Sequence, residues 1–234
     1  MEHSARTNEA PRIPALIHGA HGAAALELRP ARTADLPALA DILRDLWHTD
    51  APAGAYAHLE GLHDVLCCLD RSTHHLVATL DGAPVGVCCG CTGAPAPAGP
   101  WHAEAERAAR ALSGLDPEAA ARWDAYRRAA EDINRALIAQ AGLAGAAEVV
   151  LLAVGAAARG KGIGRELLGR MEALLAQGGA AHAFLCTDTD CDWPFYERLG
   201  LARVAAHRRG PRDLAALPTE MYVYRVPLAA RDRA

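Results

Sequence analysis

The chain has 234 residues, a net charge of −4 and 51% hydrophobic residues, whereas aromatic residues make up only 5%. This length fits a single domain, with or without an insertion, and the apolar content is sufficient for a core. The acidic balance argues against nucleic acid as a partner, because bulk binding to phosphates needs a basic surface. No apolar run approaches ~18 residues, so the sequence predicts no membrane partner and no membrane-spanning helix.

Seven cysteines are present, an odd number that does not suggest a disulfide framework. The first residues include Glu2 and Glu9 and do not resemble a signal peptide, so a reducing, cytoplasmic setting is expected. Cys88, Cys89 and Cys91 form the tightest group, but neither a C-x-x-C pair nor a His cluster accompanies them. They are therefore expected to be small buried hydrophobes, and no metal site is predicted.

The chain begins with a segment that lacks any periodicity. Residues 1–25 mix Pro, His, Ala and Gly, and we expect them to form a disordered N-terminal arm. Residues 26–228 are expected to form one domain. Its first predicted elements are a strand at 26–29 and amphipathic helices at 36–46 and 56–69, with Thr33 as the candidate N-cap of the first helix.

A β-hairpin and a helical insert are predicted next. Asp81-Gly82 supplies the turn between strands at 75–80 and 84–91. Residues 93–145, approximately, are predicted to form an insert of two helices. The second helix begins at Asp116-Pro117-Glu118, which places a cap, a proline and an acid in the favoured order. Its apolar stripe contains Trp123, Tyr126, Ala130, Ile133 and Leu137.

The stretch from Glu148 to Gln177 combines a buried strand, a glycine-rich loop and an amphipathic helix. Residues 149–154 are apolar and rich in β-branched side chains, residues 155–164 are small and carry two cations, and a helical period starts at Ile163. The first amides of a helix have no intrahelical partner, and glycines let a phosphate approach them closely. This stretch therefore predicts an anion-binding loop.

Three phosphate-binding patterns compete for this loop. A P-loop would need Ser or Thr after Lys161, where Gly162 stands, and a dinucleotide fingerprint would need Gly in place of Arg165. The pattern Arg159-x-x-Gly162-x-Gly164 fits without a gap. It resembles the acyl-CoA pyrophosphate loop of the Gcn5-related N-acetyltransferases, the GNAT superfamily.

A second signature supports this resemblance. About 30 residues downstream, after a predicted strand at 180–185, the chain reads Phe195-Tyr196-Glu197-Arg198-Leu199-Gly200-Leu201, similar to a helix of the same family. Further strands are predicted at 201–206 and 220–226. The resemblance implies a mixed α/β GNAT fold: a mostly antiparallel central sheet of about seven strands with helices on both faces. The sheet would be splayed between the fourth and fifth strands to admit the cofactor.

The resemblance also implies a donor and its binding residues. The donor is acetyl-CoA, used as a co-substrate. Its pyrophosphate would lie on the loop residues Arg159, Gly160, Lys161, Gly162, Ile163, Gly164 and Arg165. Its pantetheine arm would pair with the backbone of Ala153 and Val154. Many family members carry an Asn seven residues before the Tyr, and here Thr189 stands at that position and would substitute for it in part.

Two catalytic residues are implied in the same way. Tyr196 matches the Tyr that many members use as a general acid toward the leaving thiolate, and the alternative is that it only packs on the cofactor. Glu148 stands eleven residues before Arg159, the spacing of the general base in the histone-acetyltransferase branch, and the alternative is a solvated residue at the edge of a strand. Asp188, Asp190 and Asp192 compete with Glu148 as the base, and solvation or helix capping explains these three acids equally well. Cys191 suggests a covalent acetyl-Cys route, but no partner His can be assigned to it from the sequence.

The predicted activity is direct transfer of acetyl to a primary amine of a small molecule or protein in a ternary complex, by a monomer or homodimer. His48, Asp50, His58 and His63 are candidate acceptor contacts, with solvated surface positions as the alternative. The insert is expected either to pack on the sheet edge or to cover the acceptor site. The alternative function is a non-catalytic acyl-CoA-binding sensor or partner-binding module.

Overall fold

The computed structural model describes residues 13–16, 25–93 and 99–228. The strands of these residues form one sheet in the order β1-β2-β3-β4-β5-β6-β8-β7, in which every neighbouring pair is antiparallel except β5–β6. The strands are β1 (Ile13–Leu16), β2 (Ala25–Arg29), β3 (His74–Leu80), β4 (Ala83–Cys91), β5 (Ala147–Val154), β6 (His182–Asp188), β7 (Ala202–Arg208) and β8 (Glu220–Pro227).

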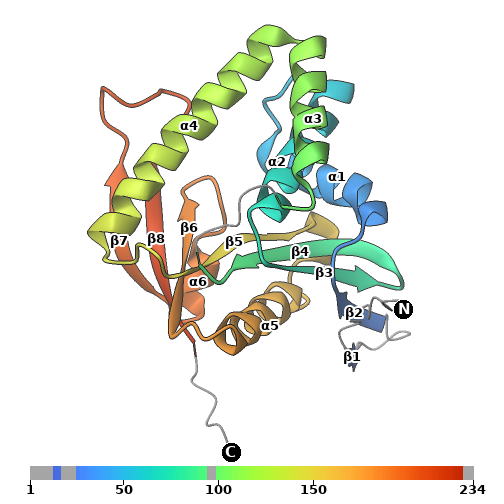
Figure 1. Cartoon of the computed structure of the whole chain (residues 1–234), viewed down its shortest axis with the longest axis vertical. Helices are drawn as coiled ribbons and strands as arrows, with labels where there is room; N and C mark the ends of the chain where they lie inside the picture. Colours follow the sequence, from blue (N-terminus) through green and yellow to red (C-terminus); the bar gives the residue numbers. More distant parts are fainter. Residues whose placement is uncertain (1–12, 17–24, 94–98, 229–234) are drawn as a thin grey trace, which may run out of the picture.

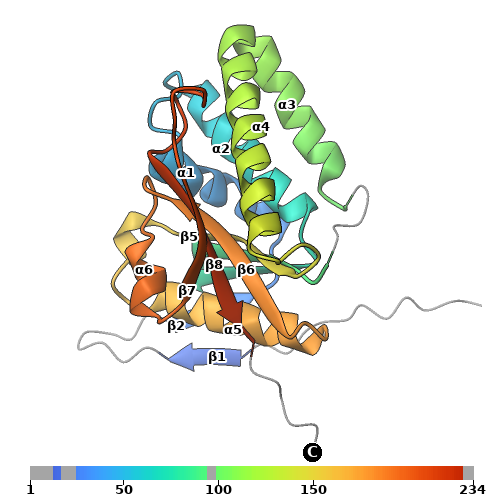
Figure 2. The same cartoon turned by 90° about the vertical axis from the view of Figure 1, so that its left-hand side faces the viewer.

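Helices cover both faces of this sheet (Figures 1 and 2). They are α1 (Leu36–Trp47), α2 (Ala55–Asp70), α3 (His102–Leu115), α4 (Pro117–Gln140), α5 (Ile163–Gln177) and α6 (Pro194–Arg198), with short 3-10 turns at Thr33–Asp35 and Ala156–Ala158. One core cluster lies under α5 and includes Leu167 and Met171, both fully buried. A second lies under α1 and α2, and a third joins α4 to β6, β7 and β8 on the face opposite α5.

The sheet opens between its two parallel strands. Only Ala147 with Ala183 and Glu148 with Phe184 are in register between β5 and β6, so the two strands separate beyond Glu148. Close to this point, the register between β4 and β5 shifts between Cys89 and Gly90. A bulge of this kind bends the strand that carries the extra residue, here β5. The predicted splay is therefore confirmed. The strands concerned are β5 and β6 in this numbering, because an additional strand precedes the predicted first one.

The predicted fold class is confirmed, with two local differences. The sheet gains a strand because Ile13–Leu16, inside the predicted arm, pairs with β2; the remainder of that arm before residue 25 lies outside the described residues. Thr33 does not cap α1. Instead the carboxylate of Asp35 accepts the backbone N–H of Arg32 at 2.8 Å and pairs with the guanidinium of Arg29 at 2.6 Å.

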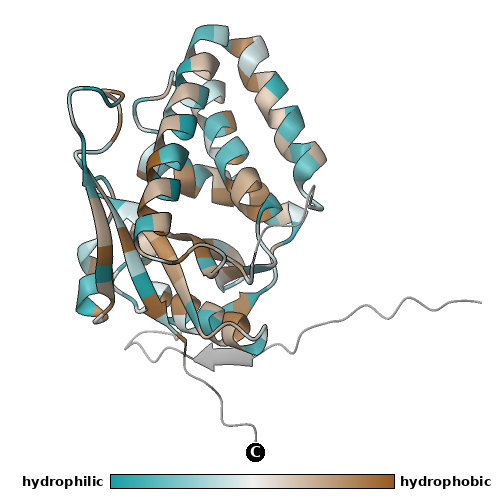
Figure 3. Ribbon diagram, turned by 60° about the vertical axis from the view of Figure 1, so that its left-hand side comes forward, coloured by the Kyte–Doolittle hydropathy of each residue, from teal (hydrophilic) through white to brown (hydrophobic). Residues whose placement is uncertain are grey.

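The insert forms the two predicted helices, and α4 is part of the main core. Asp116 caps α4 by accepting the backbone N–H of Ala119 at 2.9 Å. Leu137 is buried in a cluster with Phe184 and Val223 of the sheet. The helix α4 therefore packs on the sheet, which is the first of the two expectations for the insert. Figure 3 shows the hydrophobic residues concentrated on the strands and on the helix faces that cover them. Deleting the insert would therefore expose a core face. None of the helices described is long and apolar enough to cross a membrane.

Candidate active site

The glycine-rich loop presents free backbone amides at the mouth of the β5–β6 opening. Gly160 and Gly162 have φ angles of +75° and +79°, a region that residues with a Cβ adopt at a cost. Gly162 is the N-cap of α5, and the first helical bond runs from the Glu166 amide to the Gly162 carbonyl. Among the described residues, the amides from 160 to 165 have no hydrogen-bond acceptor. The helix dipole adds positive potential at the same place, so the loop can hold an anion.

The basic residues of the loop surround these amides. Lys161 and Arg165 are exposed, whereas Ile163 is buried under α5 and anchors the turn. The Nε of Arg159 donates to the carbonyl of Val154 at 3.2 Å. Ala153 and Val154 lie beyond the last β5–β6 pair, so one edge of this strand segment faces the opening. A pantetheine arm that pairs with Val154 would have to displace the Arg159 side chain.

The hydroxyl of Thr189 does not face the β5–β6 opening. Its Oγ1 accepts the backbone N–H of Glu220 at 3.3 Å, and its own N–H donates to the Glu220 carbonyl at 3.0 Å. Thr189 thus extends the pairing of β6 with β8. The predicted contact of this hydroxyl with pantetheine is not favoured by the placement, because the oxygen is already engaged on the β8 side.

Tyr196 lies on the α5 face of the sheet, next to the opening. Its ring packs 5.7 Å from the ring of Tyr224 and 5.3 Å from that of Phe195. Among the described residues, its hydroxyl has no hydrogen-bond partner. Burial raises the pKa of Tyr196 above that of an ordinary phenol, and the neighbouring Cys191 adds to the effect. The phenol therefore stays protonated over the neutral range and can donate a proton.

Glu148 lies on the opposite face, at the last paired position before the opening. Its Oε1 accepts a bond from a terminal nitrogen of Arg71 at 2.6 Å, and Arg71 directly follows α2. The Glu148 side chain is 19% exposed. The structure therefore does not bring Glu148 and Tyr196 together: one residue stands on each side of the opening.

Of the three competing acids, Asp188 and Asp192 are engaged by their neighbours, whereas Asp190 is exposed. Asp188 accepts the backbone N–H of Asp190 at 2.9 Å, and burial raises the pKa of Asp188. Asp192 forms an exposed ion pair with Arg198 at 3.4 Å and gives no side-chain cap to α6. Burial, aided by Asp188, raises the pKa of Cys191 to about 12. A thiol with this pKa is a poor nucleophile, which weakens the covalent route.

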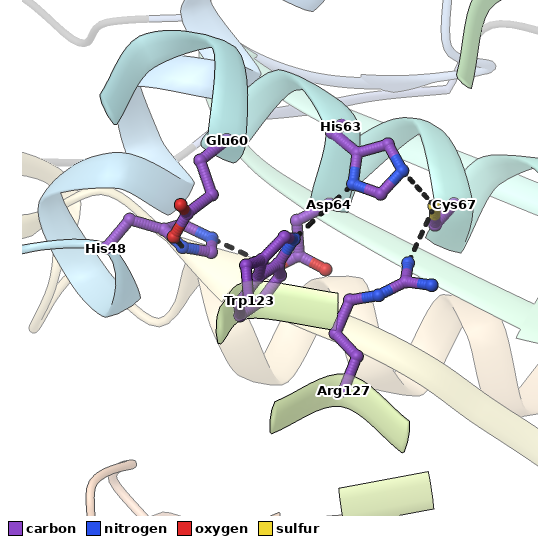
Figure 4. A network of polar contacts seen from close by, with 7 residues as sticks. All are labelled: His48, Glu60, His63, Asp64, Cys67, Trp123 and Arg127. Atoms are coloured by element: carbon purple, nitrogen blue, oxygen red, sulfur yellow. Dashed lines mark hydrogen bonds and ion pairs between the residues drawn. The ribbon is translucent and has the colours of Figure 1, made fainter. Parts of the chain in front are cut away.

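Figure 4 shows a polar network that joins α1, α2 and α4, and the sequence did not predict it. The imidazole of His48 lies between Glu60 at 2.9 Å and Asp64 at 3.1 Å. Burial alone would lower the pKa of His48, but the hydrogen bonds to Asp64 and Glu60 raise it to about 9. His48 is therefore a charged structural residue and not a solvated one.

The same network continues from His48 to α4. Trp123 packs its ring 4.9 Å from that of His48 and donates Nε1–H to the Nδ1 of His63 at 3.4 Å. Cys67 contacts the other ring nitrogen of His63 at 3.5 Å and accepts a bond from Arg127 at 3.2 Å. His63 is thus buried against α4. Of the other candidate acceptor contacts, His58 pairs with Asp41 at 2.9 Å and Asp50 is exposed.

One signal in the sequence could have indicated these missed residues. Glu60, Asp64 and Cys67 recur at helical spacing on α2, and Arg71 continues the same row just beyond its end. A row of polar side chains on one helix face next to apolar neighbours indicates a lined groove and not a core. The partners on α4 are about 60 residues distant, so no local pattern connects them.

A sheet splayed between two parallel strands, with a helix N-terminus at its mouth, defines the class of acyl-CoA N-acyltransferase folds. The model of the acetyltransferase (GNAT) family matches residues 117–201, which run from the first residue of α4 to the end of the second signature. The match therefore begins inside the segment predicted as an insert. Residues 117–201 are thus similar to the acetyltransferase (GNAT) family, as the two sequence signatures indicate.

Solved structures share this fold at low sequence identity. PH1933 from Pyrococcus horikoshii OT3 is 13% identical with a TM-score of 0.54, and the match covers 87% of this chain and 99% of that one. The ribosomal-protein-S18-alanine N-acetyltransferase from Escherichia coli is 14% identical with a TM-score of 0.50, covering 89% and 97%. An N-acetyltransferase from Staphylococcus aureus Mu50 is 14% identical with a TM-score of 0.50, and the match covers 87% of this chain and 99% of that one. No curated protein sequence matches the chain.

Proposed function

We propose that the protein transfers acetyl from acetyl-CoA to a primary amine, on a small molecule or a protein, by direct attack in a ternary complex. The observation that carries this proposal is the arrangement around the β5–β6 opening. A phosphate-binding turn lies at its mouth, a protonated phenol lies on one face and a carboxylate lies on the other. GNAT proteins generally use acetyl-CoA, and the free amides and cations of the loop fit its pyrophosphate.

The chemistry divides between the two faces. Glu148 would take a proton from the ammonium group of the acceptor, and the free amine would attack the thioester carbonyl. The tetrahedral intermediate then collapses, the C–S bond breaks, and the thiolate takes the phenol proton of Tyr196. The products are the acetamide and coenzyme A. The nitrogen of the new amide gives its second proton to the Tyr196 phenolate, and Glu148 releases the proton that it took to solvent. A phenol that remains protonated at neutral pH suits this role.

One observation favours the alternative, a non-catalytic acyl-CoA-binding sensor or partner-binding module. The carboxylate of Glu148 is already paired with Arg71 at 2.6 Å, so an incoming ammonium group would have to compete with that guanidinium for it. The two functions differ in a simple readout. Only the enzyme releases free thiol from acetyl-CoA when an amine is added.

The first test is calorimetric titration with acetyl-CoA, with ATP-magnesium as the control ligand. Binding of acetyl-CoA alone, followed by amine-dependent thiol release, would support the proposal. Binding without thiol release for any of a broad panel of amines would support the sensor. Binding of ATP alone would mean that the near-match to a P-loop at Gly155–Lys161 is the functional signal and that the proposal is wrong.

A glycine substitution separates the loop from the rest of α5. Gly162→Ala is expected to raise the Kd for acetyl-CoA about tenfold, since a residue with a Cβ pays on the order of 1–2 kcal/mol in the left-handed region and would tilt the loop amides. Gly169→Ala is the matched control, because Gly169 lies within α5 and an added Cβ meets nothing within 4 Å there. The control should leave the Kd unchanged and slightly stabilise the helix. Equal Kd values for the two variants would contradict the predicted role of the loop.

A further inference from the structure

A pocket of about 430 Å³ lies between the C-terminal half of α4, the end of α2 and the loop before β5. Its wall combines three charged side chains with apolar ones: Arg71, Glu131, Arg135, Ile138, Ala139 and Ala144. A volume of this size accommodates a small metabolite. Two guanidinium groups and one carboxylate give the lining a net positive charge.

Arg71 connects this pocket to the candidate base. It contributes to the pocket wall, and one of its terminal nitrogens lies 2.6 Å from the Oε1 of Glu148. Glu148 in turn marks the closed end of the β5–β6 opening. The pocket therefore adjoins the place where the reacting amine has to stand, on the face opposite Tyr196.

The guanidinium of Arg71 has donors to spare. Among the described residues it makes a single hydrogen bond, to Glu148, although the group carries five N–H donors. Its side chain is 47% exposed, so it is accessible from the pocket. A planar guanidinium binds carboxylates in a two-bond geometry. Arg71 can hold a second carboxylate without releasing Glu148.

One further group on α4 is available to a ligand. Among the described residues, the side chain of Arg135 pairs with Asp132 alone, at 3.0 Å, and both side chains are more than 70% exposed. Such a surface pair contributes little to stability, so Arg135 can exchange Asp132 for a ligand.

We propose that this pocket binds the carboxylate of the acceptor, so that the acceptor is an amino acid. Its carboxylate lies on Arg71 and Arg135, and its amine stands next to Glu148 at the end of the β5–β6 opening. This inference rests on the proposed acetyltransferase function and specifies the acceptor for it.

The test compares amino acids with the amines that lack only the carboxylate. Lysine with cadaverine and phenylalanine with phenethylamine form two such pairs, and thiol release from acetyl-CoA gives kcat/KM for each. The wild-type protein is expected to prefer the amino acid of at least one pair by tenfold or more. In Arg71→Gln and Arg135→Gln this ratio is expected to fall at least tenfold, chiefly through the KM for the amino acid. Arg71→Lys, which retains the charge but not the two-bond geometry, should restore part of it.

Arg110→Gln is the matched control, because Arg110 lies on α3 in an exposed pair with Glu106 and outside the pocket. It should leave the ratio unchanged. Arg135 lies on an exposed helix face, so its variant tests the proposal even where Arg71→Gln fails to fold. Equal kcat/KM for the members of each pair would overturn the inference and leave the acetyltransferase intact. Acetyl-CoA binding without thiol release for any amine would overturn both.

Discussion

Tyr196→Phe is expected to lower kcat on the order of 10²-fold while leaving the Kd for acetyl-CoA unchanged. General acid catalysis contributes about 10²–10⁴ in rate, and the substitution removes only the hydroxyl group. The ring keeps its packing against Tyr224 and Phe195, so the fold and the opening are preserved. The measurement is steady-state thiol release with the best acceptor, together with calorimetry for the donor.

Tyr222→Phe is the matched control for this variant. Tyr222 also lies in the aromatic group near Trp193, but its hydroxyl donates to Glu220 at 2.7 Å and does not face the opening. Its removal is expected to change kcat less than threefold. If Tyr196→Phe turned over as fast as the wild type, the phenol would serve only to pack the site, and the thiolate would have to take its proton from water.

Much of the fold follows from local patterns that the sequence displays directly. The cap at Asp116, the Asp81-Gly82 turn and the strand–loop–helix around Gly162 all depend on residues within one or two turns of each other. Their geometry is fixed by backbone preferences, so reading the chain in order is sufficient. The strand at Ile13–Leu16 shows the limit. Its sequence shows no alternation of apolar and polar residues, and it is a strand because it pairs with the edge of β2.

The chemistry of the acceptor side is a different case, because it is set by contacts between distant segments. Glu148 can be recognised by its spacing, but its ion pair joins residues 77 positions apart. The position of Thr189 in the chain predicts a contact with the cofactor, yet its hydroxyl accepts a hydrogen bond from Glu220, which is 31 residues distant. Spacing identifies which residues lie near a site. Only the packing of α2 and α4 determines which of their polar groups are engaged and which are free.

The His48 network holds the acceptor side together. The imidazole ring of His48 is nearly fully buried between Glu60 and Asp64 of α2, and Trp123 of α4 packs against this ring. A buried histidine between two carboxylates stabilises the fold only while its imidazole ring is protonated. The contact between α2 and the N-terminal half of α4 therefore includes a charged imidazole.

His48→Gln is accordingly expected to change the pH dependence of stability. The pKa of His48 is raised from 6.5 to about 9 in the folded state, which corresponds to roughly 3 kcal/mol of unfolding free energy. Because the folded pKa is the higher one, this contribution is complete below pH 6.5 and is lost as the pH rises through 9. Urea unfolding at pH 6 and pH 10 should show the wild-type advantage over the variant shrinking by about that amount. His58→Gln is the control for the loss of an imidazole, because the His58 ring is 38% exposed and pairs with Asp41 at the surface. A wild-type advantage over His48→Gln that stayed constant from pH 6 to pH 10 would mean that the ring is neutral in the fold and that α4 is held by apolar packing alone.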